Sequence, residues 1–168
     1  MQLNGLIYTF PKELKLLIAA FLVVLSIGFF TGLLFVGETS SVQPNGIEEQ
    51  YLGNETDEDA MVMKFKKSEK EMLTLVHNHI LSMSVIFFLV GMLLSTTKLK
   101  RKLKLFLLLE PFVSVILTFG GLYLLWCGVL WMKYIVIFSG TLMTFTFALA
   151  VLIILYQLIF SENLKSEN

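Results

Sequence analysis

The chain has 168 residues, of which 56% are hydrophobic and 15% charged, with 13 basic and 13 acidic side chains. A soluble domain usually carries about 45–50% apolar and about 25% charged residues, so this composition favours a membrane protein. The single cysteine, Cys127, excludes an intramolecular disulfide, a Cys-x-x-Cys redox pair and a thiolate-rich metal site.

Four segments are long and apolar enough to be membrane-spanning helices, which need about 20 residues each. We expect spans at about 16–36, 74–97, 105–127 and 134–160. The third span has an alternative start at Pro111, since proline suits the first turn of a helix. The first span is longer than the apolar core of a signal peptide and lacks a small-residue cleavage site, so we interpret it as an uncleaved anchor. The predicted fold class is an all-α, integral membrane four-helix bundle forming a single domain.

Charge asymmetry predicts the orientation of this bundle. Five of the seven residues in the predicted basic loop 98–104 are Lys or Arg, and such short loops stay in the cytoplasm. Both termini are then cytoplasmic, and segment 37–71, with nine acidic residues against four lysines, lies outside. The basic loop has two readings, a topology signal or a binding surface for anionic lipid. Twelve lysines against one arginine favour a bacterial source, and therefore the bacterial inner (cytoplasmic) membrane.

The outer segment is too short and too polar to form a core of its own, and we expect extended or loosely ordered chain there. Its acidic stretch at 54–59 lacks the glycine and the distal glutamate of an EF-hand, so a solvated loop is favoured over a calcium site. Asn54-Glu55-Thr56 is also a glycosylation sequon, meaningful only in a eukaryotic secretory pathway. Ser68 and Glu71 form the S-x-x-E pattern of a capping box, which predicts a helix beginning near Glu69.

The two histidines of the chain, His77 and His79, open the second span. They lie about 28 Å along a helix from Lys98, which places them at the outer interface. Residues two apart point about 200° away from each other, so the pair cannot chelate one metal ion. We expect His77 to face the bundle. The alternatives are interfacial histidines bonded to backbone or water, a cofactor-binding role towards haem b, and a proton or quinone contact.

Glu110 is the other candidate residue, lying about 9 Å along the helix from Lys104. It precedes Pro111, so it is expected to cap a helix beginning there or to extend towards the lysines. The alternative is a carboxylate that carries a proton inside a kinked helix. We predict no catalytic residue and no metal site.

Small residues in the first span, Gly28 and Gly32, form a small-xxx-small pair. Such pairs let membrane helices approach closely, either within the bundle or between two protomers. Hydroxyl residues in the third and fourth spans are expected to serve helix packing in the same way.

Two short motifs follow each other along the chain: Gly46-Ile47 with Tyr51-x-Gly53-Asn54-Glu55, and then His77-x-His79-x-x-Ser82-Met83. In these motifs the chain resembles a group of small uncharacterised bacterial inner-membrane proteins with four spans. The resemblance implies no activity. It implies that the loop motif and the histidine pair belong together, for instance through a loop that folds back over the outer end of the bundle and contacts His77 or His79.

The function that follows is a non-enzymatic membrane protein, an accessory or assembly component of a larger inner-membrane system. Haem b or quinone association through His77 or His79 is the alternative, and a small transporter is the third hypothesis. No cofactor is predicted, with haem b as the one kept open. The expected partners are the lipid bilayer and either a second copy or a larger membrane complex, with no nucleic acid.

Overall fold

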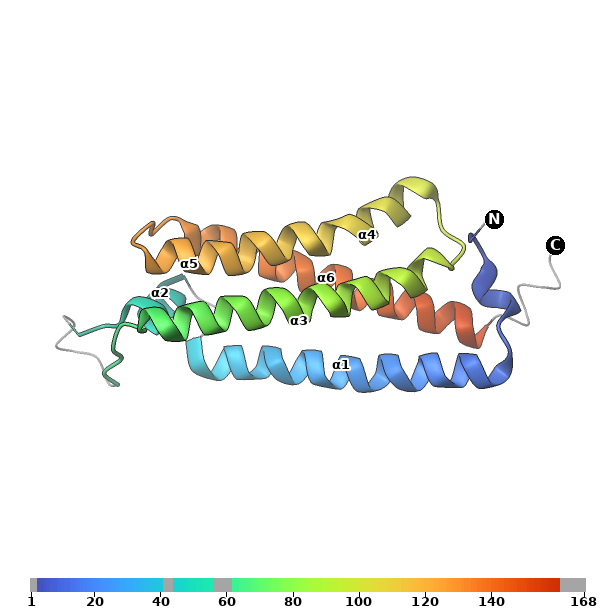
Figure 1. The fold of residues 1–168 in the computed structure, drawn as a ribbon, viewed down its shortest axis with the longest axis horizontal. Helices are drawn as coiled ribbons and strands as arrows, with labels where there is room; N and C mark the ends of the chain where they lie inside the picture. The colour runs from blue at the N-terminus through green and yellow to red at the C-terminus, as the bar shows by residue number, and fades with distance from the viewer. Residues whose placement is uncertain (1–2, 41–43, 56–61, 161–168) are drawn as a thin grey trace.

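The computed structural model describes residues 3–40, 44–55 and 62–160 of the chain, in which long helices lie side by side (Figure 1). The elements, in chain order, are η1 (Leu6–Thr9), α1 (Lys12–Ser40), α2 (Pro44–Leu52), α3 (Glu69–Ser95), α4 (Arg101–Val115), the π-helical turn η2 (Ile116–Gly120), α5 (Gly121–Trp126) and α6 (Met132–Ile159).

Four helical stretches are long and apolar enough to cross a membrane: Lys12–Thr39, Glu69–Ser95, Arg101–Trp126 and Met132–Ile159. No strand occurs within the described ranges. The structure therefore confirms the predicted class, an all-α bundle with four membrane-spanning helices.

Helix α6 forms the centre of the bundle and packs against all the other long helices. Its Phe147 is fully buried and stacks on Phe29 of α1, with ring centroids 4.0 Å apart, while Phe87 of α3 meets the same two rings edge-on. Burial is uneven: 50% of the most apolar window of the third span and 44% of that of α6 are buried, against 17% for α1 and for α3. Most of the surface of α1 and α3 is therefore left for lipid or for a partner.

The third span differs from its predicted form. Its helix begins at Arg101 and contains Pro111 in its interior, so the alternative start at Pro111 is wrong, while the span predicted from about 105 lies within this helix. A proline inside a helix removes one backbone N–H from the helical hydrogen bonds. Five residues after Pro111 the helix departs from α geometry and forms the π-helical turn η2. In a bilayer, neighbouring helices can satisfy the backbone groups that a proline or a π-helical turn leaves free, so such features occur within an apolar span. Hydropathy, which records only the apolar character of the side chains, therefore did not predict them.

The predicted basic loop 98–104 is also shorter than expected. Arg101, Lys102 and Lys104 lie in the first turns of α4, so only residues 96–100 connect the two helices. This connection is tied to both ends of the chain. Ile7 of η1 is fully buried and donates its N–H to the Thr96 carbonyl (3.2 Å), while the Gln157 amide exchanges two hydrogen bonds with the backbone of Lys98.

The outer segment contains a helix, which corrects the expectation of extended or loosely ordered chain. Helix α2 packs against α1, α5 and α6 at the opposite end of the bundle from η1 (Figure 1). Ile47, on its inner face, is only 7% exposed. The polar composition hid this helix, which is anchored onto the ends of the longer ones by Ile47 together with the partly buried Tyr51 and Leu52.

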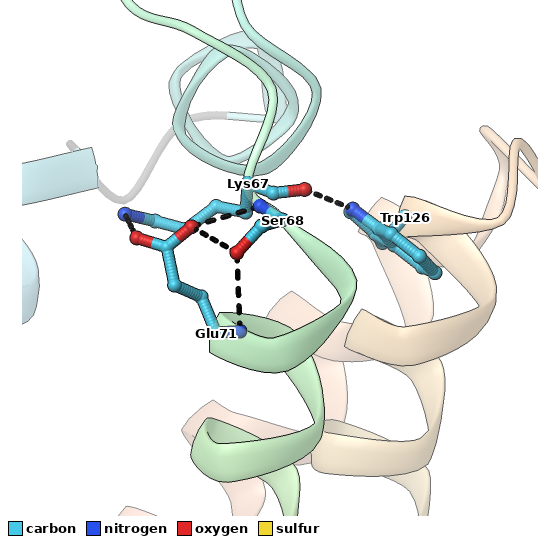
Figure 2. Close-up of polar contacts among 4 residues, drawn as sticks. All are labelled: Lys67, Ser68, Glu71 and Trp126. Carbon is cyan, nitrogen blue, oxygen red and sulfur yellow. Dashed lines mark hydrogen bonds and ion pairs between the residues drawn. The ribbon is translucent and has the colours of Figure 1, made fainter.

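The capping box at the start of α3 is confirmed. Ser68 and Glu71 exchange their hydrogen bonds as predicted: the Ser68 N–H donates to the Glu71 carboxylate (2.8 Å) and the Glu71 N–H donates to Ser68 Oγ (3.3 Å) (Figure 2). Two backbone donors that would otherwise lack a partner at the helix start are thereby satisfied.

Replacing Ser68 with alanine removes the acceptor for the Glu71 N–H and is expected to cost about 1 kcal/mol of unfolding free energy. Denaturant titration in detergent micelles, followed by circular dichroism, measures the loss. Ser82→Ala is the matched control, because the Ser82 hydroxyl donates only to carbonyls of its own helix. Equal losses in the two variants would contradict the capping role.

Candidate functional site

His79 is the histidine that contacts a neighbouring helix. Its Nδ1 lies 2.8 Å from the Leu75 carbonyl, one turn earlier in α3, and its ring stacks on Phe119 of η2 with centroids 4.7 Å apart. A carbonyl oxygen can only accept, so Nδ1 carries the proton in this contact. The second ring nitrogen, Nε2, is left without a hydrogen in the neutral ring.

Both histidines are exposed on α3, and the one whose ring stacks on a neighbouring helix is His79, so the expectation that His77 is the histidine facing the bundle is wrong. Because residues two apart point to nearly opposite sides of a helix, the contact of His79 with Phe119 turns His77 outward. Among the described residues no group of three or more His, Cys, Asp or Glu side chains comes together as a metal site.

Glu110 lies inside the bundle, with 8% of its surface exposed. Its carboxyl group accepts a hydrogen bond from Ser114 Oγ, one turn later in α4, and lies 2.5 Å from Thr146 Oγ1 of α6. The expectation that Glu110 caps a helix or reaches towards the lysines is therefore wrong, because α4 continues through this position. The i,i+4 spacing on one helix could have identified Ser114 as a partner of Glu110. Thr146 lies 36 residues away, so its contact with Glu110 could be found only from the folded structure.

Lys104 does not pair with Glu110 in the structure. Its ammonium group donates to three oxygens at the end of the bundle: Asn4 Oδ1 (2.8 Å), the Ser95 carbonyl (3.0 Å) and the Thr97 carbonyl (2.5 Å). These bonds fasten the start of α4 to the end of α3 and to the N-terminal segment. Lys104 therefore stabilises the end of the bundle through these hydrogen bonds and not through the expected contact with Glu110.

A second polar contact lies further along the same helix pair. Thr118 of η2 and Ser139 of α6 are both buried, and their hydroxyl oxygens are 2.7 Å apart. Ser139 and Thr146 are seven residues apart, about 10 Å along α6. We use the name α4–α6 polar seam for the five residues Glu110, Ser114, Thr118, Ser139 and Thr146.

The Tyr51-x-Gly53-Asn54-Glu55 motif closes the outer segment on itself. Gly53 adopts φ +83°, and an added Cβ would lie 2.7 Å from the Lys66 backbone nitrogen. Asn54 accepts from the Lys64 N–H through its side chain (2.6 Å) and donates its own N–H to the Lys64 carbonyl (2.9 Å). Burial raises the pKa of the Tyr51 phenol above its ordinary value. The motif is therefore explained by local folding.

Two further contacts fasten this segment to the third and fourth spans. Trp126 of α5 donates its indole N–H to the Lys67 carbonyl at 2.7 Å (Figure 2), and Lys133 pairs with Glu48 of α2 at 2.6 Å. The loop thus folds back over the end of the bundle opposite η1, through Trp126 and Lys133. No hydrogen bond from the described loop residues to His77 or His79 is present. Part of the acidic stretch considered for calcium, 56–59, lies outside the described residues, as does Thr56 of the sequon.

An apolar groove of about 550 Å³ runs between α1 and α6. Its lining includes Ile27, Phe30 and Leu34 of α1 and Val151 and Leu155 of α6. A groove of this chemistry on a membrane-spanning surface suits lipid acyl chains.

These features together define an integral membrane protein with four transmembrane helices and a helical cap, α2, over one end of the bundle. A family model described as a transmembrane helical domain matches residues 41–165, and the chain belongs to this family. The match takes in α2 to α6 and leaves out the whole of α1. No curated protein and no solved structure matches the chain.

Replacing Gly53 with alanine is expected to loosen the outer segment. The left-handed conformation costs a non-glycine residue about 1–2 kcal/mol, and the added Cβ would meet the backbone of Lys66. A loss of that size corresponds to about 5–30-fold faster backbone hydrogen exchange at residues 64–67, if these amides exchange through local opening. Gly37→Ala is the control, since its Cβ would meet nothing within 4 Å. Unchanged exchange in Gly53→Ala would refute the role of this glycine.

Proposed function

We propose that this chain is a non-enzymatic integral membrane protein that serves as an accessory or assembly component of an inner-membrane system. In this proposal α1 is the helix to which a further membrane helix binds. The observation that carries it is the open space beside Gly28 and Gly32, where an added Cβ would meet no atom within 4 Å.

Two other glycines in the spans, Gly91 and Gly121, are closely packed within the bundle. A Cβ at Gly121 would lie 3.0 Å from Val136 Cγ2, and one at Gly91 would lie 3.3 Å from Leu108 Cδ2. Glycine in a helix costs about 1 kcal/mol relative to alanine, while small residues let helices approach closely in lipid. Two glycines one turn apart that the bundle does not use therefore support a contact outside it.

The position of α1 also supports this proposal. It packs mainly against α6 and α2, and its Gly28 and Gly32 are exposed. All of α1 lies outside the residues that the family model matches, and the matched residues take in α2 to α6. A peripheral helix added to such a domain is suited to binding a partner.

The double variant Gly28→Leu/Gly32→Leu is expected to lose the partner without unfolding the bundle, because both positions face open space. Wild-type protein purified in mild detergent from native membranes should retain a second membrane component, identified by mass spectrometry as another protein or a second copy. Gly37→Leu is the control, since it lies nine residues from Gly28 and so points to the other side of α1. Retention by the double variant, or wild type purifying alone as a monomer, would contradict the proposal.

The orientation belongs to the same proposal, with the basic end of the bundle and both termini in the cytoplasm. Cys127 is exposed and directly follows α5, the short helix that packs against α2. A membrane-impermeant maleimide should therefore label it in intact cells. The control Cys127→Ser/Lys100→Cys places the thiol at the exposed position Lys100, at the basic end, and should be labelled only after lysis. The reverse pattern would overturn the orientation.

Haem b binding is the second candidate, and His79 is the residue that the geometry favours for it. Metal-binding histidines commonly donate their other ring N–H to a backbone carbonyl, as His79 Nδ1 does to Leu75. Two protomers would each supply one such ring.

Under this candidate, protein supplemented with haem shows a Soret band that His79→Ala abolishes. His77→Ala, two residues away, is the matched control and should retain the band. A wild-type protein without a Soret band would eliminate haem b binding.

A further inference from the structure

The hydrogen-bond geometry around Glu110 carries an inference beyond the proposed docking role. The carboxyl group is 8% exposed and lies between α4 and α6. Oε1 accepts from Ser114, and Oε2 faces Thr146 Oγ1 at 2.5 Å. Thr146 Oγ1 also lies 3.0 Å from the Leu142 carbonyl and 3.1 Å from the Met143 carbonyl, both in the preceding turn of its own helix.

The number of donors distinguishes two states of this group. A threonine hydroxyl has one hydrogen to donate and two lone pairs. If Glu110 is ionised, that hydrogen goes to Oε2 and the Leu142 carbonyl loses it. If Glu110 is a neutral acid, its own O–H donates to Thr146 Oγ1, and Thr146 donates onward to Leu142. The neutral acid supplies its own donor to the Glu110–Thr146 contact and leaves the Thr146 hydrogen for the adjacent carbonyls of Leu142 and Met143, whereas the ionised acid takes that hydrogen from them.

The charges around the site also favour the neutral acid. Helix α3 carries no acidic or basic residue from Ile80 to Ser95, and α6 carries none from Tyr134 to Ile159. On α4 the nearest cation in sequence is Lys104, which is bonded to Asn4, Ser95 and Thr97. Tyr123 of α5 and Tyr134 and Tyr156 of α6 lie near the ends of their helices. A carboxylate at Glu110 would thus be a buried charge without a cation in the described part of the bundle, which is costly.

We propose that Glu110 is a proton-binding site, carried in the resting bundle as the neutral acid in the chain Glu110 O–H to Thr146 to the Leu142 carbonyl. Proton release to water, as hydronium, leaves a carboxylate that takes the hydrogen of Thr146 and leaves the Leu142 carbonyl without it. Proton binding from water reverses both changes. Because Glu110 belongs to α4 and Leu142 to α6, the proton alters the link between these two helices.

Infrared spectroscopy of the protein in lipid bilayers tests this assignment at neutral pH, where exposed carboxylates are ionised. Wild type should show the carbonyl band of a hydrogen-bonded carboxylic acid, which shifts in heavy water. The band should be lost in Glu110→Gln. It should shift in frequency in Thr146→Val, which removes the hydroxyl, and stay in place in Thr146→Ser, which keeps it. A spectrum without this band, or a band unmoved by Thr146→Val, would overturn the proposal.

A second measurement needs no variant and so does not depend on the folding of Glu110→Gln. A hydrophobic carbodiimide takes the proton of a neutral carboxylic acid onto its nitrogen while the carboxyl oxygen adds to its carbon, and rearrangement leaves a stable N-acylurea. Peptide mass mapping of treated wild type should place this adduct on Glu110, with less adduct as the pH rises. Absence of the adduct on Glu110 would count against the neutral acid.

Discussion

The structure depends on one constraint, namely that a polar side chain within the hydrocarbon of a bilayer must find its partner in the protein. The α4–α6 polar seam meets this constraint for the third and fourth spans. Thr118 and Ser139 bond each other, and Glu110 bonds Ser114 and Thr146. Apolar side chains gain little from one another against lipid tails, so these hydrogen bonds and close packing set which helices stay together. The best-buried spans are the two that the seam joins.

The ends of the bundle are held by different means. At the basic end, Gln157 and Lys104 bond the connection between α3 and α4. At the other end, α2 is fixed by the ion pair of Glu48 with Lys133, and the following chain by the bond from Trp126. Both ends thereby join their polar segments to the third and fourth spans. Helix α1 takes little part in this scheme, which agrees with a role in contacts outside the bundle.

Sequence alone predicted the parts of this fold that are governed by local chemistry. Four apolar stretches gave the four spans, and the spacing of Ser68 and Glu71 gave the start of α3. Helix α2 escaped prediction because its anchoring depends on Ile47 meeting helices distant in the sequence. The alternative helix start at Pro111 was wrong because a proline usually begins or breaks a helix, whereas tertiary packing keeps α4 continuous through this position.

The candidate site was predicted in its residues but not in its geometry. Glu110, His77 and His79 were identified because ionisable groups are rare in such spans. The partner of Glu110, Thr146, is 36 residues away, and the contact of His79 with Phe119 depends on how α3 is rotated in the bundle. Neither can be read from spacing along one helix. The motif around Gly53 was recognised by its residues, and only the positive φ shows that its role is structural.

The central claim is that the α4–α6 polar seam holds the third and fourth spans together. A double-mutant cycle between Thr118→Val and Ser139→Ala, measured as unfolding free energy in lipid-detergent micelles, tests it most directly, because this pair involves no ionisable group. The account predicts a favourable coupling of about 0.6 kcal/mol, the average for hydrogen bonds between membrane helices. Two substitutions whose effects simply add, with no coupling, would contradict it.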